Sequence, residues 1–271
     1  MGKRGERFLR LVSLLGFTLL FSLPFFLVFL KFFINGRCVS WLCVSGLFFS
    51  FFLVFLGGGV FIVKFPVFLF HMWLPRAHVE APTVGSVILA ACLLKLGSYG
   101  FARFFAFFFS GFGFFFVLGC VGMLFASLCC LFSCDLKALV AYSSVFHIRA
   151  VFRGFMLHSE VSFLSSVSLR CAHGFVSALF FFVVGCCYDV KGARSFLIFG
   201  AGGLSGFTFW LLVVFLNSGL PISLPFFSEV FLFSQQVSFF FPSFFLSFVS
   251  QFFGGLFGML LLFFSGVKLF A

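Results

Sequence analysis

The chain has 271 residues, of which 63% are hydrophobic and only 8% charged, and its mean hydropathy is +1.29. Soluble domains average about 25% charged residues, so this composition excludes a soluble fold and indicates a membrane protein. The formal charge of +11 does not indicate a nucleic-acid binder, because the 17 basic residues are scattered singly and form no basic patch.

Long apolar stretches follow one another along the chain. A spanning helix needs roughly 20 apolar residues, and the sequence predicts about eight such spans. They are expected near residues 11–33, 39–63, 83–109, 113–133, 135–157, 161–188, 196–217 with a continuation through 229, and 243–267. The first apolar run is too long for a secretory signal and has no small-residue cleavage site. We therefore expect an all-α, polytopic transmembrane helix bundle, with residues 1–271 forming a single transmembrane domain.

Two of the predicted helices are broken beside an ionisable residue. The second span runs into Lys64 and a proline-rich connection at 66–82, and the seventh breaks at 218–221 before Glu229. Backbone groups freed by such breaks are tolerated in a membrane only where protein or a water-filled cavity covers them. Paired broken helices are typical of transport sites built on inverted repeats.

The sequence contains no cysteine or nucleotide-binding motif that would indicate a cofactor. The ten cysteines lie mostly in apolar segments, without a Cys-x-x-Cys pair or a Cys–His zinc spacing. The sequence also has no glycine-rich nucleotide loop, iron–sulfur framework or haem motif. We expect no disulfide, no metal and no redox group in this chain.

Five ionisable residues inside apolar segments are candidate proton carriers: Lys64, Lys95, His147, His173 and Glu229. A charge inside a bilayer is costly, so buried lysine and glutamate can exchange protons near neutral pH, where histidine also titrates. Simpler roles stay open: Lys64 can snorkel from a helix end, Glu229 can meet a helix dipole, and a buried histidine can be a packing residue.

The segment from Lys64 to Gly100 also carries a family resemblance. It reads Lys-Phe-Pro, then His-x-Trp-Leu-Pro-x-Ala-His-Val-Glu-Ala-Pro from His71, then Leu-Leu-Lys-x-Gly-x-Tyr-Gly around Lys95. This pattern closely resembles the chain-4 family of antiporter-like, proton-pumping subunits of NADH:ubiquinone oxidoreductase (respiratory complex I). The resemblance covers roughly residues 40–235 and implies the antiporter-like subunit fold.

The resemblance assigns roles to individual residues. Lys64 and Lys95 match the family's two membrane lysines, and Glu229, after Gly-Leu-Pro, matches its distal glutamate. His147 and His173 would bridge the lysine side to the glutamate. Supporting polar roles are expected for His71, His78, Glu80, Ser143, Ser144 and Ser177, with the serines holding water and the first three facing a helix end or polar cavity.

The function implied by the resemblance is proton translocation coupled to NADH-to-quinone electron transfer. Flavin, iron–sulfur clusters and quinone are then expected in partner subunits, beside neighbouring antiporter-like chains and lipids. The 58 phenylalanines suggest a T-rich organellar gene, and hence a multi-pass, mitochondrially encoded protein of the mitochondrial inner membrane. Two alternatives remain, a cation/proton antiporter subunit and a non-pumping structural scaffold of the complex.

One departure from the family concerns the acid that pairs with its first lysine. Family members carry further N-terminal helices with a glutamate for this lysine, whereas Glu6 is the only acid before Lys64 here. We expect either a separate chain that replaces those helices and supplies the carboxylate, or a degenerate half-channel. Arg149, which lies inside the fifth span just after His147, is a second departure from the family.

Overall fold

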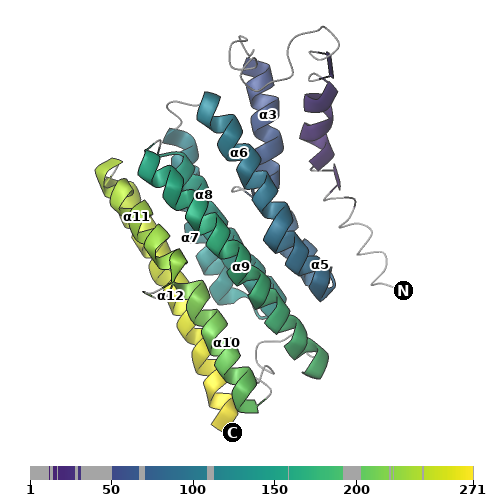
Figure 1. The fold of residues 1–271 in the computed structure, drawn as a ribbon, viewed down its shortest axis with the longest axis vertical. Coiled ribbons are helices and arrows are strands. Elements are labelled where there is room, and N and C mark those ends of the chain that lie inside the picture. Colours follow the sequence, from purple (N-terminus) through teal and green to yellow (C-terminus); the bar gives the residue numbers. More distant parts are fainter. Residues whose placement is uncertain are drawn as a thin grey trace.

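The computed structural model describes residues 12, 15–16, 18–27, 30–31, 51–66, 71–108, 113–157, 159–191, 203–219, 221, 223–239 and 241–270. The regular elements named within these ranges are all helices, which confirms the all-α prediction. They lie side by side in an elongated bundle (Figure 1). Glu6 and the predicted start of the second span lie outside the described residues.

The helices follow the apolar stretches of the sequence closely. After an N-terminal helix, Thr18–Leu27, they are α3 (Phe51–Lys64), α4 (Trp73–Glu80), α5 (Thr83–Ile88), the π-helical turn η1 (Leu89–Leu93), α6 (Leu94–Phe108), α7 (Gly113–Phe132), α8 (Leu136–Phe155), α9 (Glu160–Lys191), α10 (Gly203–Ser218), α11 (Leu224–Phe239) and α12 (Phe241–Phe270). Both predicted helix breaks are present, after Lys64 and between α10 and α11.

Three helices of the described part are long and apolar enough to cross a membrane: Thr83–Arg103, Glu160–Asp189 and Ser243–Phe263. Shorter apolar helices run through Thr18–Leu27, Phe116–Phe132 and Gly206–Ser218. These helices support a polytopic membrane protein. The number of about eight spans stays a prediction.

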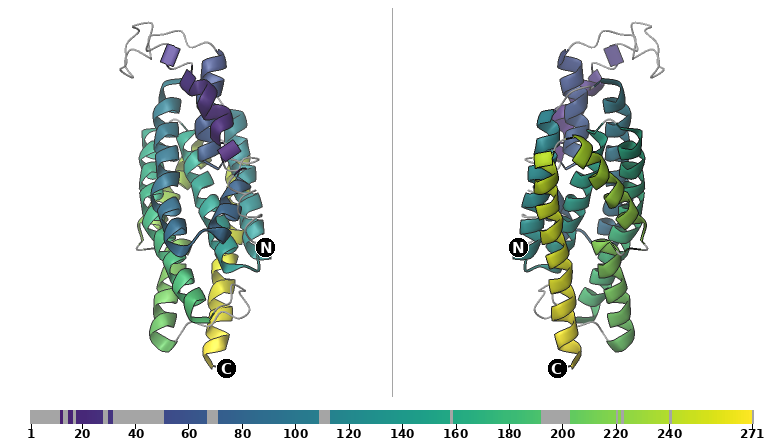
Figure 2. Two further views of the ribbon diagram at one scale, coloured as in Figure 1. Left: turned by 90° about the vertical axis from the view of Figure 1, so that its right-hand side faces the viewer. Right: turned by 90° about the vertical axis from the view of Figure 1, so that its left-hand side faces the viewer.

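Helix α8 is the central element of the bundle. It packs against α7 and α9, while α12 packs on α7 and α11 packs on α9. Nearly every side chain of α8 is buried. The two side views show α10, α11 and α12 on one side of the molecule and α3 with its partner α6 toward the other (Figure 2). A helix enclosed in this way can carry polar groups without exposing them to lipid.

The breaks in the helices are covered by side chains from elsewhere in the fold. The indole Nε1 of Trp73 donates to the carbonyl oxygen of Val63 at 3.1 Å, at the end of α3. Nζ of Lys137 donates to the carbonyl oxygen of Ala81 at 3.1 Å, between α4 and α5. These bonds satisfy main-chain carbonyls that an unbroken helix would satisfy itself, as a low-dielectric surrounding requires.

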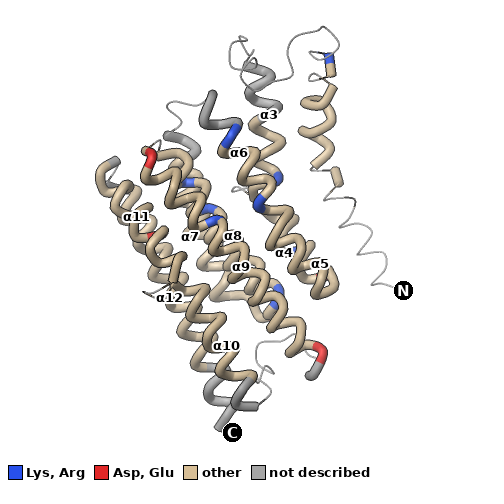
Figure 3. The backbone as a smooth tube through the Cα atoms, in the orientation of Figure 1, with Lys and Arg blue, Asp and Glu red and all other residues tan. Residues whose placement is uncertain are grey.

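Positive charges occur inside the bundle as well as at helix ends (Figure 3). Lys137, Arg149 and Arg153 are all buried on α8, and each arginine is only 1% exposed. Acidic residues are sparse in the described part of the chain. The interior of this bundle is therefore both polar and basic along α8.

Candidate functional site

Lys95 lies at the start of α6, directly after the π-helical turn η1. Its Nζ is 3.0 Å from Nδ1 of His173 on α9. A Cβ added at Gly174 would be 3.1 Å from Cε of Lys95, so this glycine leaves room for the lysine stem to reach the histidine. π-helical turns are frequent at functional sites, and this one sets where Lys95 meets α9.

His173 and His147 form the next part of the site. Their ring centroids are 5.2 Å apart with the ring planes inclined by 36°, and both side chains are buried. Nε2 of His173 has no hydrogen-bond partner among the described residues. The step from His173 to His147 is therefore a contact between rings, without a direct hydrogen bond from Nε2 in the described part of the chain.

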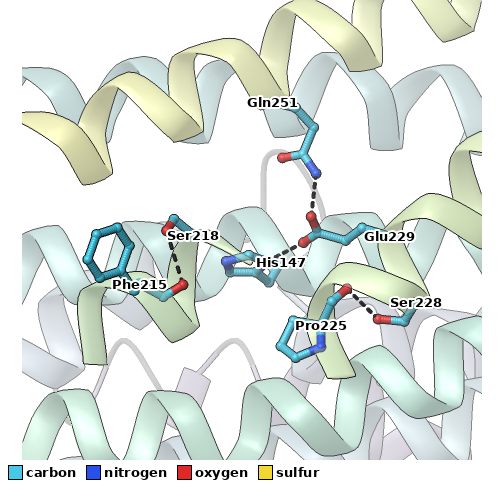
Figure 4. Close-up of polar contacts among 7 residues, drawn as sticks. All are labelled: His147, Phe215, Ser218, Pro225, Ser228, Glu229 and Gln251. Carbon is cyan, nitrogen blue, oxygen red and sulfur yellow. Dashed lines mark hydrogen bonds and ion pairs between the residues drawn. The ribbon is translucent and has the colours of Figure 1, made fainter. Parts of the chain in front are cut away.

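Glu229 completes the line on the far side of His147. Nδ1 of His147 lies 3.2 Å from Oε1 of Glu229, and Nε2 of Gln251 on α12 donates to Oε2 at 2.9 Å. Figure 4 shows the carboxylate held between the histidine and the glutamine. The structure thus joins Lys95, His173, His147 and Glu229, four of the five candidate proton carriers, through α6, α9, α8 and α11.

A cavity of about 410 Å³ opens beside Glu229. Its polar lining comes from His147, Asn217, Ser218, Glu229 and Gln251, together with Ser127 and Ser143. Gly219 has φ = +78°, a backbone conformation that favours glycine, and a Cβ there would lie 3.7 Å from Oε2 of Glu229. The α10–α11 break therefore brings the chain close to the carboxylate and leaves space next to it.

Lys64 lies apart from this line. It is the last residue of α3 and is exposed within the described part of the chain, where no ion pair reaches its amine. Gly97 of α6 packs against its backbone, since a Cβ on Gly97 would be 3.1 Å from Cβ of Lys64. The two lysines thus lie on packed neighbouring helices, as predicted, but only Lys95 contacts a histidine.

The predicted supporting residues occupy more varied places. The hydroxyls of Ser143, Ser144 and Ser177 donate to carbonyl oxygens of their own helices at 2.8, 2.7 and 3.2 Å, and of these only Ser143 lines the cavity. His78 is fully buried and stacks on Phe181 with ring centroids 4.3 Å apart. The roles of the three serines as water holders, and that of His78 at a helix end or polar cavity, stay predictions.

The two remaining supporting residues flank the first helix break. His71 is buried in the turn before α4, with its ring edge toward Phe125 at a centroid distance of 5.7 Å. Glu80 is the last residue of α4 and is half-buried. Both lie in the connection between α3 and α5, where the sequence predicted a helix end.

Sequence reasoning missed Gln251, which binds Glu229 directly. The available signal was a lone glutamine within an apolar span, next to the small residues Gly254 and Gly255. It also gave no role to the buried Arg153. Among the described residues, no group of three or more histidine, cysteine, aspartate or glutamate side chains is placed to hold a metal ion.

Comparison with known proteins identifies, along most of the chain, the family that the sequence motifs resemble. Residues 13–258 match the family described as NADH:quinone oxidoreductase/Mrp antiporter, transmembrane. NADH-ubiquinone oxidoreductase chain 4 of Ascaris suum is 37% identical over 259 residues, covering 87% of this chain and 58% of the relative. The Caenorhabditis elegans chain 4 is 41% identical over 181 residues, covering 65% and 44%. This chain spans about half the length of the curated relatives it matches.

Solved structures show the same fold at lower identity. A chain of respiratory complex I from Thermus thermophilus superposes with a TM-score of 0.83 at 21% identity, covering 96% of this chain and 58% of that chain. A chain of the Mrp complex from Dietzia sp. gives 0.76 at 18% identity, covering 92% and 49%. The chain belongs to the NADH:quinone oxidoreductase/Mrp antiporter transmembrane family and is a homologue of NADH-ubiquinone oxidoreductase chain 4.

Proposed function

We propose that this chain is an antiporter-like, proton-translocating membrane-arm subunit of NADH:ubiquinone oxidoreductase. The observation that carries the proposal is the row of neighbouring side chains from Lys95 through His173 and His147 to Glu229. Each member stands next to a group that can accept or donate a proton. Four helices contribute to this line, and it ends at a cavity large enough to hold water.

A proton moves along this line by stepwise exchange. The Lys95 ammonium donates to Nδ1 of His173, 3.0 Å away, and the resulting imidazolium releases its other ring proton from Nε2 to a water beside His147. His147 accepts that proton and passes one to Glu229, 3.2 Å from its Nδ1. The neutral carboxyl then releases the proton into the cavity, while Lys95 is reprotonated from the side of α3 and Lys64.

The energy for this transfer comes from outside the chain. Moving one charge against 100 mV costs about 2.3 kcal/mol, more than a hydrogen bond of ordinary strength contributes. In this proposal electron transfer from NADH to quinone takes place in partner subunits that hold flavin, iron–sulfur clusters and quinone. That reaction shifts the protonation of the relay, and this chain contributes no redox group.

The proposal also implies a cellular location and a set of partners. We assign it to the mitochondrial inner membrane as a multi-pass, mitochondrially encoded subunit, in contact with neighbouring antiporter-like chains and with lipid. The animal relatives and the phenylalanine-rich composition support this assignment. The exposure of Lys64 supports a carboxylate supplied to it from outside the described residues.

A second candidate function is cation/proton antiport without a redox partner, which the fold shared with the Mrp complex supports. Purification from detergent-solubilised membranes separates the two. We expect the chain to co-purify with a rotenone-sensitive NADH:quinone reductase. A particle without flavin and iron–sulfur subunits would favour the antiporter, and normal pumping after Lys95→Ala would favour a scaffold role.

A further inference from the structure

Arg153 is a buried cation that the proton line does not use. It lies on α8, C-terminal to His147, and is 1% exposed. No carboxylate in the described part of the chain forms an ion pair with it. A guanidinium is seldom buried without a specific set of acceptors, because its desolvation is costly. Its contacts therefore show what it holds in place.

The main partner of Arg153 is Gln236 on α11, which is fully buried. With its amide oxygen turned to the guanidinium, Gln236 accepts from NH2 at 3.0 Å and from NH1 at 3.1 Å, and it donates to Oγ of Ser247 at 2.9 Å. This orientation fits its surroundings, because the Ser247 hydroxyl donates its hydrogen bond to the carbonyl oxygen of Phe244 at 2.7 Å and can therefore accept one from the Gln236 amide. One amide therefore connects α8, α11 and α12.

Two further contacts keep the guanidinium in this place. Its Cζ lies 5.6 Å from the ring centroid of Phe233, on the same helix as Gln236. Gly154, the next residue of α8, has no room for a Cβ, because Leu232 of α11 and Ser166 of α9 occupy that space. The Leu232 side chain of α11 thus packs onto the backbone of α8 next to the arginine.

The arginine bridge and the relay contact join the same two helices. Gln236 lies about 10.5 Å along α11 from Glu229, and Arg153 lies about 9 Å along α8 from His147, at 1.5 Å per residue. The two bridges run in the same direction and have matching spacing, so they form a two-point attachment. A slip of α11 by one turn, about 5.4 Å, would break the 3.2 Å contact between His147 and Glu229.

We propose that Arg153 is a positioning residue for the relay: through Gln236 it fixes α11 against α8 and keeps the Glu229 carboxylate within reach of His147. The role rests on the proposed function insofar as the contact carries protons. The positioning itself is a statement about structure. A fork of several donors suits this task better than a single ammonium, because one guanidinium can hold one amide oxygen from several sides.

The test uses the assembled complex with Arg153→Met, with Gln236→Leu, and with the exchanged pair Arg153→Gln/Gln236→Arg. Gln235→Leu, one residue before Gln236 and half-buried, is the matched control. The separation of His147 and Glu229 is read from cryo-electron microscopy, and proton pumping is measured in proteoliposomes beside Lys95→Ala. Assembly is followed on native gels, so that loss of folding is seen separately.

We expect each single variant to lengthen the His147–Glu229 contact beyond 4 Å, the usual limit of an ion pair, and to pump no better than Lys95→Ala. The exchanged pair should restore both the contact and the pumping. An unchanged contact in an assembled Arg153→Met complex overturns the proposal, even if pumping is lost. If the single variants do not assemble, assembly and pumping of the exchanged pair support it, and failure of that pair overturns it. Normal pumping by Lys95→Ala would instead contradict the proposed function, while the measured contact still decides the positioning.

Discussion

Nζ of Lys95 lies 3.0 Å from Nδ1 of His173, although the two residues belong to different helices far apart in the sequence. The contact places an amine against an imidazole in the interior of a membrane protein, without a carboxylate between them. Two basic groups at this distance share a hydrogen bond only when one of them is neutral. The pair is therefore suited to pass a proton rather than to hold two charges.

Replacement of Lys95 tests this pair directly. Lys95→Ala removes the donor, and Lys95→Arg supplies a guanidinium that is effectively never deprotonated. We expect both variants to lower proton pumping by this subunit at least about a hundredfold, the lower end of what general acid–base groups contribute. Pumping per NADH oxidised in proteoliposomes is the measurement. Arg103→Ala, an exposed cation of the same helix, is the control, and normal pumping by Lys95→Arg would show that only a fixed charge is needed.

Replacement of His147 tests the middle of the line. His147→Phe keeps an aromatic ring between His173 and Glu229 but removes both nitrogens, so packing is preserved while the proton path is cut. We expect pumping to fall as far as in Lys95→Ala, with the complex still assembled. Tyr142→Phe, on the same helix, provides the control because it removes one hydroxyl and keeps the ring. Equal pumping by His147→Phe and Tyr142→Phe would mean that protons take another path.

Gln251 is expected to tune Glu229 rather than carry protons itself. Gln251→Leu removes the 2.9 Å bond to Oε2, and hydrogen bonds to charged groups contribute about 1.5–3 kcal/mol. The carboxylate loses that hydrogen bond, so the frequency of its infrared stretching band should shift from that in the unsubstituted chain. Phe252→Leu, which changes an exposed neighbour on α12, should leave the band in place. An unshifted band in Gln251→Leu would show that the bond is not formed in the membrane.

Lys64 should have an acidic partner in the assembled complex. Its amine is exposed at the end of α3 in the described part of the chain, and an unpaired ammonium within a membrane costs several kcal/mol. We expect a structure of the complex to show an aspartate or glutamate carboxylate within 4 Å of Nζ, the usual limit of an ion pair. If only apolar side chains surround Nζ at mid-membrane depth, the degenerate half-channel becomes the better account.

Gly97 should limit how closely α6 can pack on α3. A Cβ there would lie 3.1 Å from Cβ and 3.3 Å from the carbonyl carbon of Lys64, and overpacking of a close contact costs about 1–3 kcal/mol. Gly97→Ala should therefore lower the thermal stability of the detergent-solubilised complex. Gly255→Ala, on α12 with no neighbour within 4 Å, is the control. Equal melting temperatures for both variants would contradict the close packing.

The sequence predicted the helices well, because long apolar runs and prolines leave few other choices. The breaks after Lys64 and before Glu229 were visible as prolines beside an ionisable residue. The identity of His147 and His173 as candidates came from their local motifs. Their mutual contact could not be predicted, because it depends on how α8 and α9 are rotated about their axes.

The parts that sequence reasoning missed are side chains whose partners lie on other helices. Gln251 reads as one amide in an apolar span, and nothing near it in the chain points to Glu229. Arg149 was recognised only as a departure from the family; in the structure its NH1 donates to the carbonyl of Gly122 on α7. Such pairings follow from tertiary packing, which periodicity and composition do not specify.

The π-helical turn η1 has a consequence for the rod formed by α5, η1 and α6. A π-helical turn holds one residue more than an α-helical path would, so it offsets the angular phase of everything after it by about 100°. Thr83, before the turn, packs against Gly185 of α9, and Lys95, after it, meets His173 of the same helix. The phase offset lets both ends of one rod face a single partner. Deleting one residue from Leu89–Leu93 would therefore close the turn into an α-helical path and leave Lys95 facing α9, whereas deleting one residue from the α-helix before or after it would turn Lys95 away.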